Sequence, residues 1–322
     1  MVSNQTTSPQ ASARSAPYAG LRELVILGGT VRSSALSSAI GRSLLDLPLN
    51  ETETLLDRWV AEVDTLVGLR GLSPLNIRVM LDAASAAPRL PETAAGYASV
   101  HQRRITIEQD PFEFRGTGGV LHDTSKSLAD DDYLLVVGGA QLPTEPLTDL
   151  VDALADHEGD AVLLAHRDGT PSGLMLLRCG VLRGISELGF VDLKEQALPS
   201  IARQFHVAVE YRPRAGLSFR GAQDYLGALR FDHRRRRGEA VSPDAYTEDW
   251  HSEFTVAEPG AAIAPTARLF DSVVLTGGTV GENALLVRTI VCPGGVVKPG
   301  ERLIDQLVTA VDTIPHTSRG DA

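Results

Sequence analysis

The stretch LRELVILGGTVR, residues 21–32, decides the fold. It contains the apolar run Glu23–Leu27, which has strand length and ends in Gly28 and Gly29. Uninterrupted apolar runs are typical of strands that are covered on both faces. Further runs of this kind are found at 76–81, 133–137, 161–165, 173–177 and 207–211.

Two amphipathic helical patterns lie between these strands, at 51–66 and 146–159. Alternation of strands and helices predicts an α/β domain with a mostly parallel, Rossmann-like sheet. Ligands of such sheets bind beyond the carboxyl ends of the strands. We therefore expect the site in the loops after Leu27, Leu81 and Val137.

Composition excludes several classes of protein. The 322 residues include 30 Lys and Arg against 41 Asp and Glu, a net charge of −11. So acidic a chain is a poor non-specific binder of nucleic acid or anionic membranes. No apolar run approaches the roughly 20 residues of a membrane-spanning helix. Two distant cysteines exclude a disulfide framework. We expect a cytoplasmic protein with neither nucleic acid nor membrane as a partner.

The domain boundaries are predicted from changes in composition. Residues 1–20 are rich in Ser, Thr and Ala and predict a disordered tail, followed by the α/β domain at 21–230. Residues 231–255 predict a linker that contains Arg234–Arg237. This arginine run could bind phosphate, but a solvated helix end or linker is the more common reading. A second tail is predicted at 306–322.

The segment 256–305 has a different pattern. Aliphatic residues recur about every six positions at Ile263, Leu269, Leu275 and then Val280 or Leu286. This spacing predicts a short left-handed parallel β-helix of eighteen residues per turn, with a Gly-rich meander as the alternative. So few turns cannot bury their own ends. We expect packing on the α/β domain, on another copy or on an active paralogue.

Glycine-rich loops supply the candidate binding residues. Gly28 and Gly29 follow the first strand, and Gly116-Thr117-Gly118-Gly119 opens a helix. Such turns let backbone N–H groups approach a phosphate or a base. A third loop, Gly138-Gly139-Ala140, follows another buried strand, and adjacent Lys194 and Glu195 lie beside a turn. Each loop is a weak signal alone, but their order along the chain is specific.

In this order the motifs resemble the sugar-1-phosphate nucleotidyltransferases, most closely the mannose-1-phosphate guanylyltransferase-like branch with its C-terminal left-handed β-helix. The resemblance covers about residues 21–300, with Asp192–Gln196, Pro199 and Asp224-Tyr225-Leu226 as further matches. It implies nucleotide contacts at Leu27, Gly28, Gly29, Thr30, Gly116, Thr117, Gly118 and Gly119. It implies sugar-side contacts at Gly173, Lys194 and Glu195, and catalytic roles for Arg32 and Arg42, the latter replacing the family's lysine.

The same resemblance implies two Mg²⁺-binding aspartates, and both are missing. Ala140 and Ser218 stand at their places. Two hypotheses follow. The chain either binds a nucleotide or nucleotide sugar as a catalytically impaired sensor or regulatory partner, or it is an active pyrophosphorylase that uses Mg²⁺. A third reading, an acyltransferase built on the β-helix, is disfavoured because residues 256–300 contain no histidine.

Overall fold

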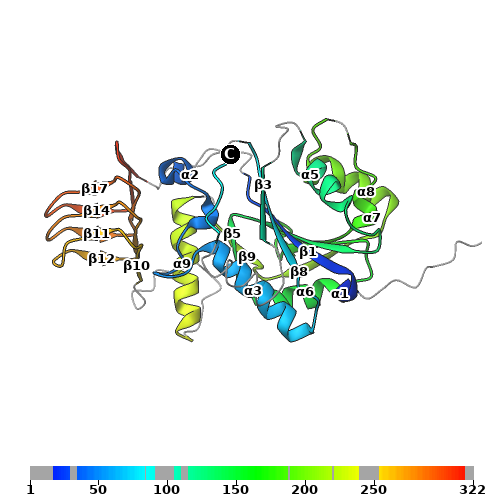
Figure 1. Ribbon diagram of the computed structural model, residues 1–322. Coiled ribbons are helices and arrows are strands. Elements are labelled where there is room, and N and C mark those ends of the chain that lie inside the picture. Colours follow the sequence, from blue (N-terminus) through cyan, green and yellow to red (C-terminus); the bar gives the residue numbers. More distant parts are fainter. Residues whose placement is uncertain are drawn as a thin grey trace, which may run out of the picture.

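A computed structural model describes most of the chain (Figure 1). The described residues are 17–29, 35–83, 85–90, 105–109, 115–187, 189–219, 221–238 and 254–315. The predicted site residues Thr30 and Arg32 lie outside these ranges. So do residues 1–16 of the predicted N-terminal tail and most of the predicted linker.

A seven-stranded sheet forms the centre of the α/β domain, in the order β3-β2-β1-β4-β7-β6-β8. Its neighbours pair in parallel except where β7 runs antiparallel to both β4 and β6. The mostly parallel sheet and the six predicted strands are confirmed; β3 was missed because ITIEQ is short and half polar. The strands are β1 (Leu21–Leu27), β2 (Asn76–Leu81), β3 (Ile105–Gln109), β4 (Tyr133–Gly138), β6 (Ala161–His166), β7 (Pro171–Arg178) and β8 (Val207–Arg212).

Helices cover both faces of this sheet (Figure 1). On one face lie α3 (Leu55–Arg70) and α6 (Leu147–Ala155), and on the other α5 (Gly116–Ser125), α7 (Cys179–Leu182) and α8 (Leu198–Gln204). Strand β1 alternates between these two layers. Leu24 and Ile26 join the α3 and α6 side, whereas Val25 packs with the α5, α7 and α8 side.

The longest helix has well-defined ends. Thr54 and Asp57 form a capping box at the start of α3, and Gly71 ends it in the left-handed conformation at φ 60°. Its buried face places Trp59 in the main core. The remaining elements of this domain are α1 (Pro17–Gly20), α2 (Ala35–Ile40), η1 (Leu44–Asp46), β5 (Gln141–Pro143), η2 (Leu193–Ala197), β9 (Gly216–Ser218) and α9 (Ala222–Arg236).

Residues 254–315 form a coil of short strands, here called the C-terminal coil. Its strands belong to three parallel stacks, β10-β13-β16-β19, β11-β14-β17 and β12-β15-β18, and β20 pairs antiparallel with β19. They are β10 (Thr255–Ala257), β11 (Ala262–Ile263), β12 (Arg268–Phe270), β13 (Ser272–Val274), β14 (Thr279–Val280), β15 (Leu285–Val287), β16 (Ile290–Val291), β17 (Val296–Val297), β18 (Arg302–Ile304), β19 (Gln306–Val308) and β20 (Thr313–Pro315).

Each turn of the coil takes seventeen residues, not the eighteen expected. Thr255 pairs with Ser272, and Ala262 with Thr279. The shorter turn arises because the inward positions are spaced by six, six and five residues. These interior positions are Ile263, Leu269, Val274, Val280, Leu286, Val291, Val297, Leu303 and Val308.

The corners of the coil explain why this sequence can turn so tightly. Gly260, Gly277 and Gly294 occupy equivalent corners at φ 89°, 79° and 75°, a conformation that glycine adopts without strain. A second corner repeats Asp271, Arg288 and Asp305 at φ 48°, 47° and 55°. Non-glycine residues are uncommon in this region, and arginine is not among those favoured there.

The coil packs against the α/β domain beside α2 and α9 (Figure 1). Its inner core is separate, but Val273, Leu275, Ile290 and Cys292 belong to the main core of the α/β domain. Strand β13, which ends just before Leu275, is therefore covered by the coil interior on one side and by the α/β domain on the other. The predicted inward orientation of Leu275 is wrong, because its neighbour Val274 takes the inward position.

The structure corrects three predicted boundaries. Helix α9 continues to Arg236, so residues 231–236 are helical and not part of a linker. β19 and β20 occupy part of the predicted C-terminal tail, and α1 occupies residues 17–20 of the predicted N-terminal tail. No helix in the described ranges has the length and hydropathy needed to cross a bilayer.

Candidate functional site

The order of the strands reverses between β1 and β4, which is where ligands bind in open α/β sheets. The loops Gly28-Gly29 and Gly138-Gly139 leave the sheet side by side at this point. A methyl group on Gly139 would lie 2.8 Å from the Cα of Gly28. Glycine is therefore required here for the close approach of the two loops.

Some of these glycines use their N–H groups within the fold. The N–H of Gly28 donates to the carbonyl of Met80 at 2.8 Å, and that of Gly139 donates to Leu27 at 2.8 Å. These two N–H groups stabilise the loops and are already occupied in this conformation. The predicted contacts of Leu27, Gly28 and Gly29 with a nucleotide stay predictions.

Asp82, which follows β2, borders the same loop. A methyl group on Gly29 would lie 2.9 Å from the backbone nitrogen of Asp82 and 3.2 Å from its Oδ2. Its position directly after Leu81 was the signal that could have identified it, because that loop was one of the three expected to bear the site. A carboxylate here repels a phosphate and accepts hydrogen bonds from hydroxyl or N–H donors.

The Gly116–Gly119 turn packs against the predicted sugar-side segment. Gly116 adopts φ 65°, and a Cβ there would lie 2.5 Å from the carbonyl oxygen of Val191. The N–H of Gly118 donates to that oxygen at 2.9 Å, and the Oγ1 of Thr117 accepts from Leu193 N at 3.1 Å. The structure brings the two motifs together through these contacts, and the ligand roles that the resemblance implies for them stay predictions.

The predicted sugar-side residues lie at exposed or open positions. Lys194 and Glu195 are exposed, and their backbone N–H groups donate to the carboxylate of Asp192 at 2.7 Å each. Gly173 adopts φ 85° and faces Gln141, whose Oε1 would lie 3.2 Å from a Cβ on that glycine. Gln141 was not predicted as a site residue from the sequence, because it lies just after the loop Gly138-Gly139-Ala140.

The two positions that lack aspartate lie close together. β5 and β9 pair antiparallel with Gln141 opposite Ser218, and the N–H of Phe219 donates to the carbonyl of Ala140 at 2.8 Å. Mg²⁺ prefers carboxylate oxygens. Neither Ala140 nor Ser218 supplies one, and no cluster of three His, Cys, Asp or Glu suited to a metal exists among the described residues. The described part of this site does not fit Mg²⁺.

Arg42 lies at the junction with the coil. Its Nη2 forms an ion pair with Glu258 at 2.6 Å, and both side chains are largely buried. Burial raises the pKa of nearby Asp46, although the N–H of Arg89 and the charge of Arg42 oppose the shift. Arg42 therefore serves domain packing in this structure, and the catalytic role that the resemblance implies for it stays untested.

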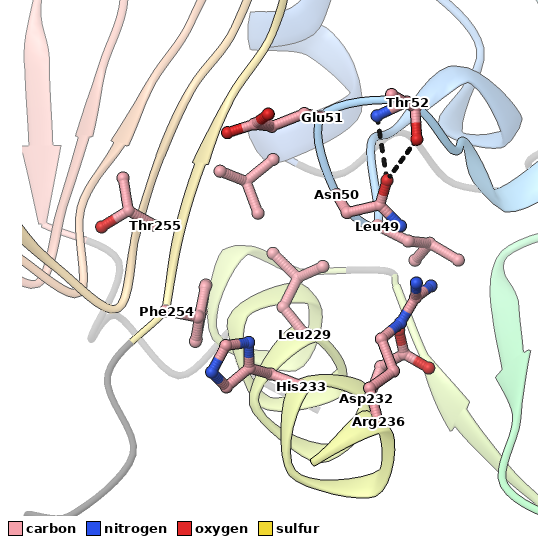
Figure 2. Close-up of a pocket in the computed structure, with 11 residues that line it drawn as sticks. Leu49, Asn50, Glu51, Thr52, Leu229, Asp232, His233, Arg236, Phe254 and Thr255 are labelled. Atoms are coloured by element: carbon pink, nitrogen blue, oxygen red, sulfur yellow. Dashed lines mark hydrogen bonds and ion pairs between the residues drawn. The ribbon is translucent and has the colours of Figure 1, made fainter.

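A cavity of about 300 Å³ opens on one side of this junction (Figure 2). Its lower wall is the face of α9 that carries Leu229, Asp232, His233 and Arg236. Figure 2 shows His233 beside Phe254 and Arg236 beside Asp232. The opposite wall is formed by residues 49–52, where Asn50 holds Thr52 through two hydrogen bonds.

The arginine run closes helix α9. Arg236 pairs with Asp232 at 2.7 Å and with Glu53, while Arg235 lies 3.4 Å from Asp232. Basic side chains are favourable at a helix C-terminus. Of the two readings left open, helix end or linker, the structure shows the helix end, and Arg234 is buried and not solvated.

Neither cysteine is a candidate nucleophile. Cys179 and Cys292 are both free and buried. Burial raises the pKa of each thiol to about 12. The thiolate is the reactive form of cysteine, so both are unreactive at neutral pH.

No protein-family model matches this chain, and no curated protein matches it. Among solved structures, HddC from Yersinia pseudotuberculosis matches with a TM-score of 0.42 and 12% identity over 65% of this chain and 98% of that one. The same protein complexed with GMP-PN gives 0.42 and 15% over the same shares.

A Bacillus anthracis protein, assigned as a glucose-1-phosphate thymidylyltransferase and solved with sucrose, gives a TM-score of 0.46 and 11% identity. This match covers 62% of the present chain and 89% of the other. Likenesses of this size do not identify a family or a function for this chain.

Proposed function

We propose that the chain binds a nucleotide or nucleotide sugar at the crevice between β1 and β4, and acts as a catalytically impaired sensor or regulatory partner. The observation that carries the proposal is the proximity of Ala140 and Ser218 at the carboxyl edge of the sheet. The glycine loops follow β1 and β4, and Lys194 is exposed, while positions 140 and 218 lack carboxylates.

The physical argument concerns charge in the transition state. Nucleotidyl transfer builds negative charge on phosphate oxygens, and catalysis depends on cations placed against them. Two side chains without charge at the positions of metal ligands remove the means of holding such a cation. Ligand binding depends less on this cation than catalysis does, because hydrogen bonds and stacking hold the base and the sugar.

The alternative is an active pyrophosphorylase that transfers a nucleotidyl group to a sugar-1-phosphate and releases pyrophosphate. It requires a carboxylate other than those expected at 140 and 218. Asp82 is a candidate for this role, because its Oδ2 would lie 3.2 Å from a Cβ on Gly29 in the first glycine loop.

Thermal unfolding with a panel of nucleoside diphosphates and nucleotide sugars tests the binding. A ligand at a hundredfold excess over its Kd stabilises the fold by about 2.7 kcal/mol, which raises Tm by several degrees. We expect at least one member to do so. No shift with any member would contradict nucleotide binding.

Restoring the two carboxylates tests the loss of catalysis. We expect Ala140→Asp with Ser218→Asp to release pyrophosphate from a nucleoside triphosphate and a sugar-1-phosphate with Mg²⁺, and the wild type to release none above background. The double variant Ala140→Asn with Ser218→Asn is the matched control, since it has similar bulk without charge. A wild type as fast as the restored variant would establish the active alternative.

We further propose that the C-terminal coil is the left-handed parallel β-helix expected from its repeat. Its three stacks and one aliphatic side chain per short strand support this assignment. A cytoplasmic location is proposed on the two free cysteines, which suit a reducing compartment.

A further inference from the structure

A second cavity, of about 230 Å³, lies between β9, the first half of α9 and one corner of the C-terminal coil. It is smaller than the roughly 300–1,000 Å³ of drug-sized pockets, so it suits a group of monosaccharide size and not a whole nucleotide. Its lining is Leu217, Ser218, Gln223, Asp224, Leu226, Gly227, Ala228, Arg230, Arg288 and Asp305.

Gly227 lines this cavity. It lies in the middle of α9, where glycine costs about 1 kcal/mol relative to alanine. A Cβ on Gly227 would meet no atom within 4 Å, and its φ is not in the left-handed region. Neither packing nor backbone conformation therefore requires glycine, and a larger side chain here would project into the cavity.

Each arginine of the cavity lining is paired with a carboxylate. Arg230 pairs with Asp271 at 2.6 Å, and Arg288 forms two hydrogen bonds with Asp305 at 2.6 and 2.8 Å. Asp224 adds one further carboxylate. Such a lining does not select an anion, because each arginine already faces a carboxylate.

The chemistry of the lining matches a polyol. Guanidinium and amide groups donate, carboxylates accept, and the hydroxyl of Ser218 does both, while Leu217 and Leu226 provide apolar surface. A sugar ring presents the same mixture of vicinal hydroxyls and C–H groups. The backbone of Arg288, which lines the cavity, adopts φ 47°, a conformation that is unfavourable for arginine.

We propose that this cavity binds a neutral, polyhydroxylated group of monosaccharide size, either a free sugar or the sugar of a larger ligand. The coil and the α/β domain would then form one binding site together, since Arg288 and Asp305 come from the coil and Ser218 and Gln223 from the α/β domain. The two proposed sites share Ser218, but Gly227 and Gln223 line only the cavity among the residues named for either site, so variants there test the cavity separately.

The test is saturation-transfer NMR on the full chain with D-glucose, D-mannose and, separately, the corresponding nucleoside diphosphate sugars. We expect signals from the ring protons of at least one sugar in the wild type. Gly227→Leu should weaken this binding by about tenfold or more, because its side chain occupies the space that the ligand needs. Signals from free sugars identify a free ligand, and signals only from the nucleotide sugars identify a larger one.

Gly68→Leu is the matched control. Gly68 also lies in a helix, α3, with no atom within 4 Å of an added Cβ, but it is outside the cavity. It should bind as the wild type does. Gln223→Leu gives a second test if Gly227→Leu does not fold, because Gln223 is exposed and contributes only its amide. The proposal is overturned by a wild type that binds no sugar, or by equal binding in the wild type and both cavity variants.

Discussion

Replacing Arg58 with alanine is expected to lower the free energy of unfolding by about 3–5 kcal/mol, as measured by denaturant unfolding. Arg58 bridges two acidic residues from distant parts of the chain. It contacts Glu53 at 2.7 Å and Asp232 at 2.8 Å, and the Asp232 side chain is only 1% exposed. The variant leaves a buried carboxylate without its principal partner, which is the costly outcome.

The same network predicts how stability depends on pH. Burial alone would raise the pKa values of Asp232 and Glu53, but hydrogen bonds from Arg58 and Arg236 lower both below their usual range. A lowered pKa in the folded state contributes stability above the unfolded pKa of roughly 4, and this is lost as the pH falls through the folded value. Arg58→Ala should therefore flatten the acid limb of the stability profile.

A double variant separates pairing from packing. Arg58→Met with Asp232→Leu replaces the pair by apolar side chains, which is often close to neutral. We expect it to be more stable than Arg58→Ala alone. If Arg58→Ala unfolded at the same denaturant concentration as the wild type, the network would contribute nothing to the free energy of unfolding.

Arg42→Ala is expected to lower the free energy of unfolding by about 3 kcal/mol. The variant leaves Glu258, which is 9% exposed, inside the junction without its cation. The hydrogen bonds that Glu258 accepts from the N–H and hydroxyl of Thr276 do not neutralise its charge. Thermal and denaturant unfolding of both proteins measure the difference.

Glu258→Gln in the Arg42→Ala background is the informative control, because it removes the uncompensated charge and keeps an acceptor for Thr276. It should recover part of the lost stability. Unchanged stability in Arg42→Ala, together with loss of nucleotide-induced thermal shift, would instead place Arg42 in the binding site as the resemblance implies.

Much of the fold could be predicted from local patterns. Strand β2 has the predicted bounds, 76–81, because a short run of apolar residues between turn signals has few other stable conformations. The aliphatic repeat after residue 256 likewise identified a stacked structure. Its turn length could not be predicted from spacing, since a run such as Val273-Val274-Leu275 does not reveal which side chain faces inward.

The candidate site was predictable only in part. The loop after Leu81 was expected to bear part of the site, but Asp82 itself was not identified. The packing of the Gly116–Gly119 turn against residues 191–193 was not predicted either. The use of the Gly28 and Gly139 N–H groups within the loops was not predictable, because a glycine pair reads the same whether its backbone meets a ligand or another loop.

The sequence by itself determined the alternation of strands and helices, the glycine loops at the strand ends, the repeat of the C-terminal coil and the uncharged residues at positions 140 and 218. These depend on residues near one another in the chain. Only the tertiary structure decided that Arg42 pairs with Glu258, 216 residues away, and that α9 and the coil enclose a cavity at Gly227. Such contacts depend on how two packed surfaces meet, and no local pattern records which surfaces those are.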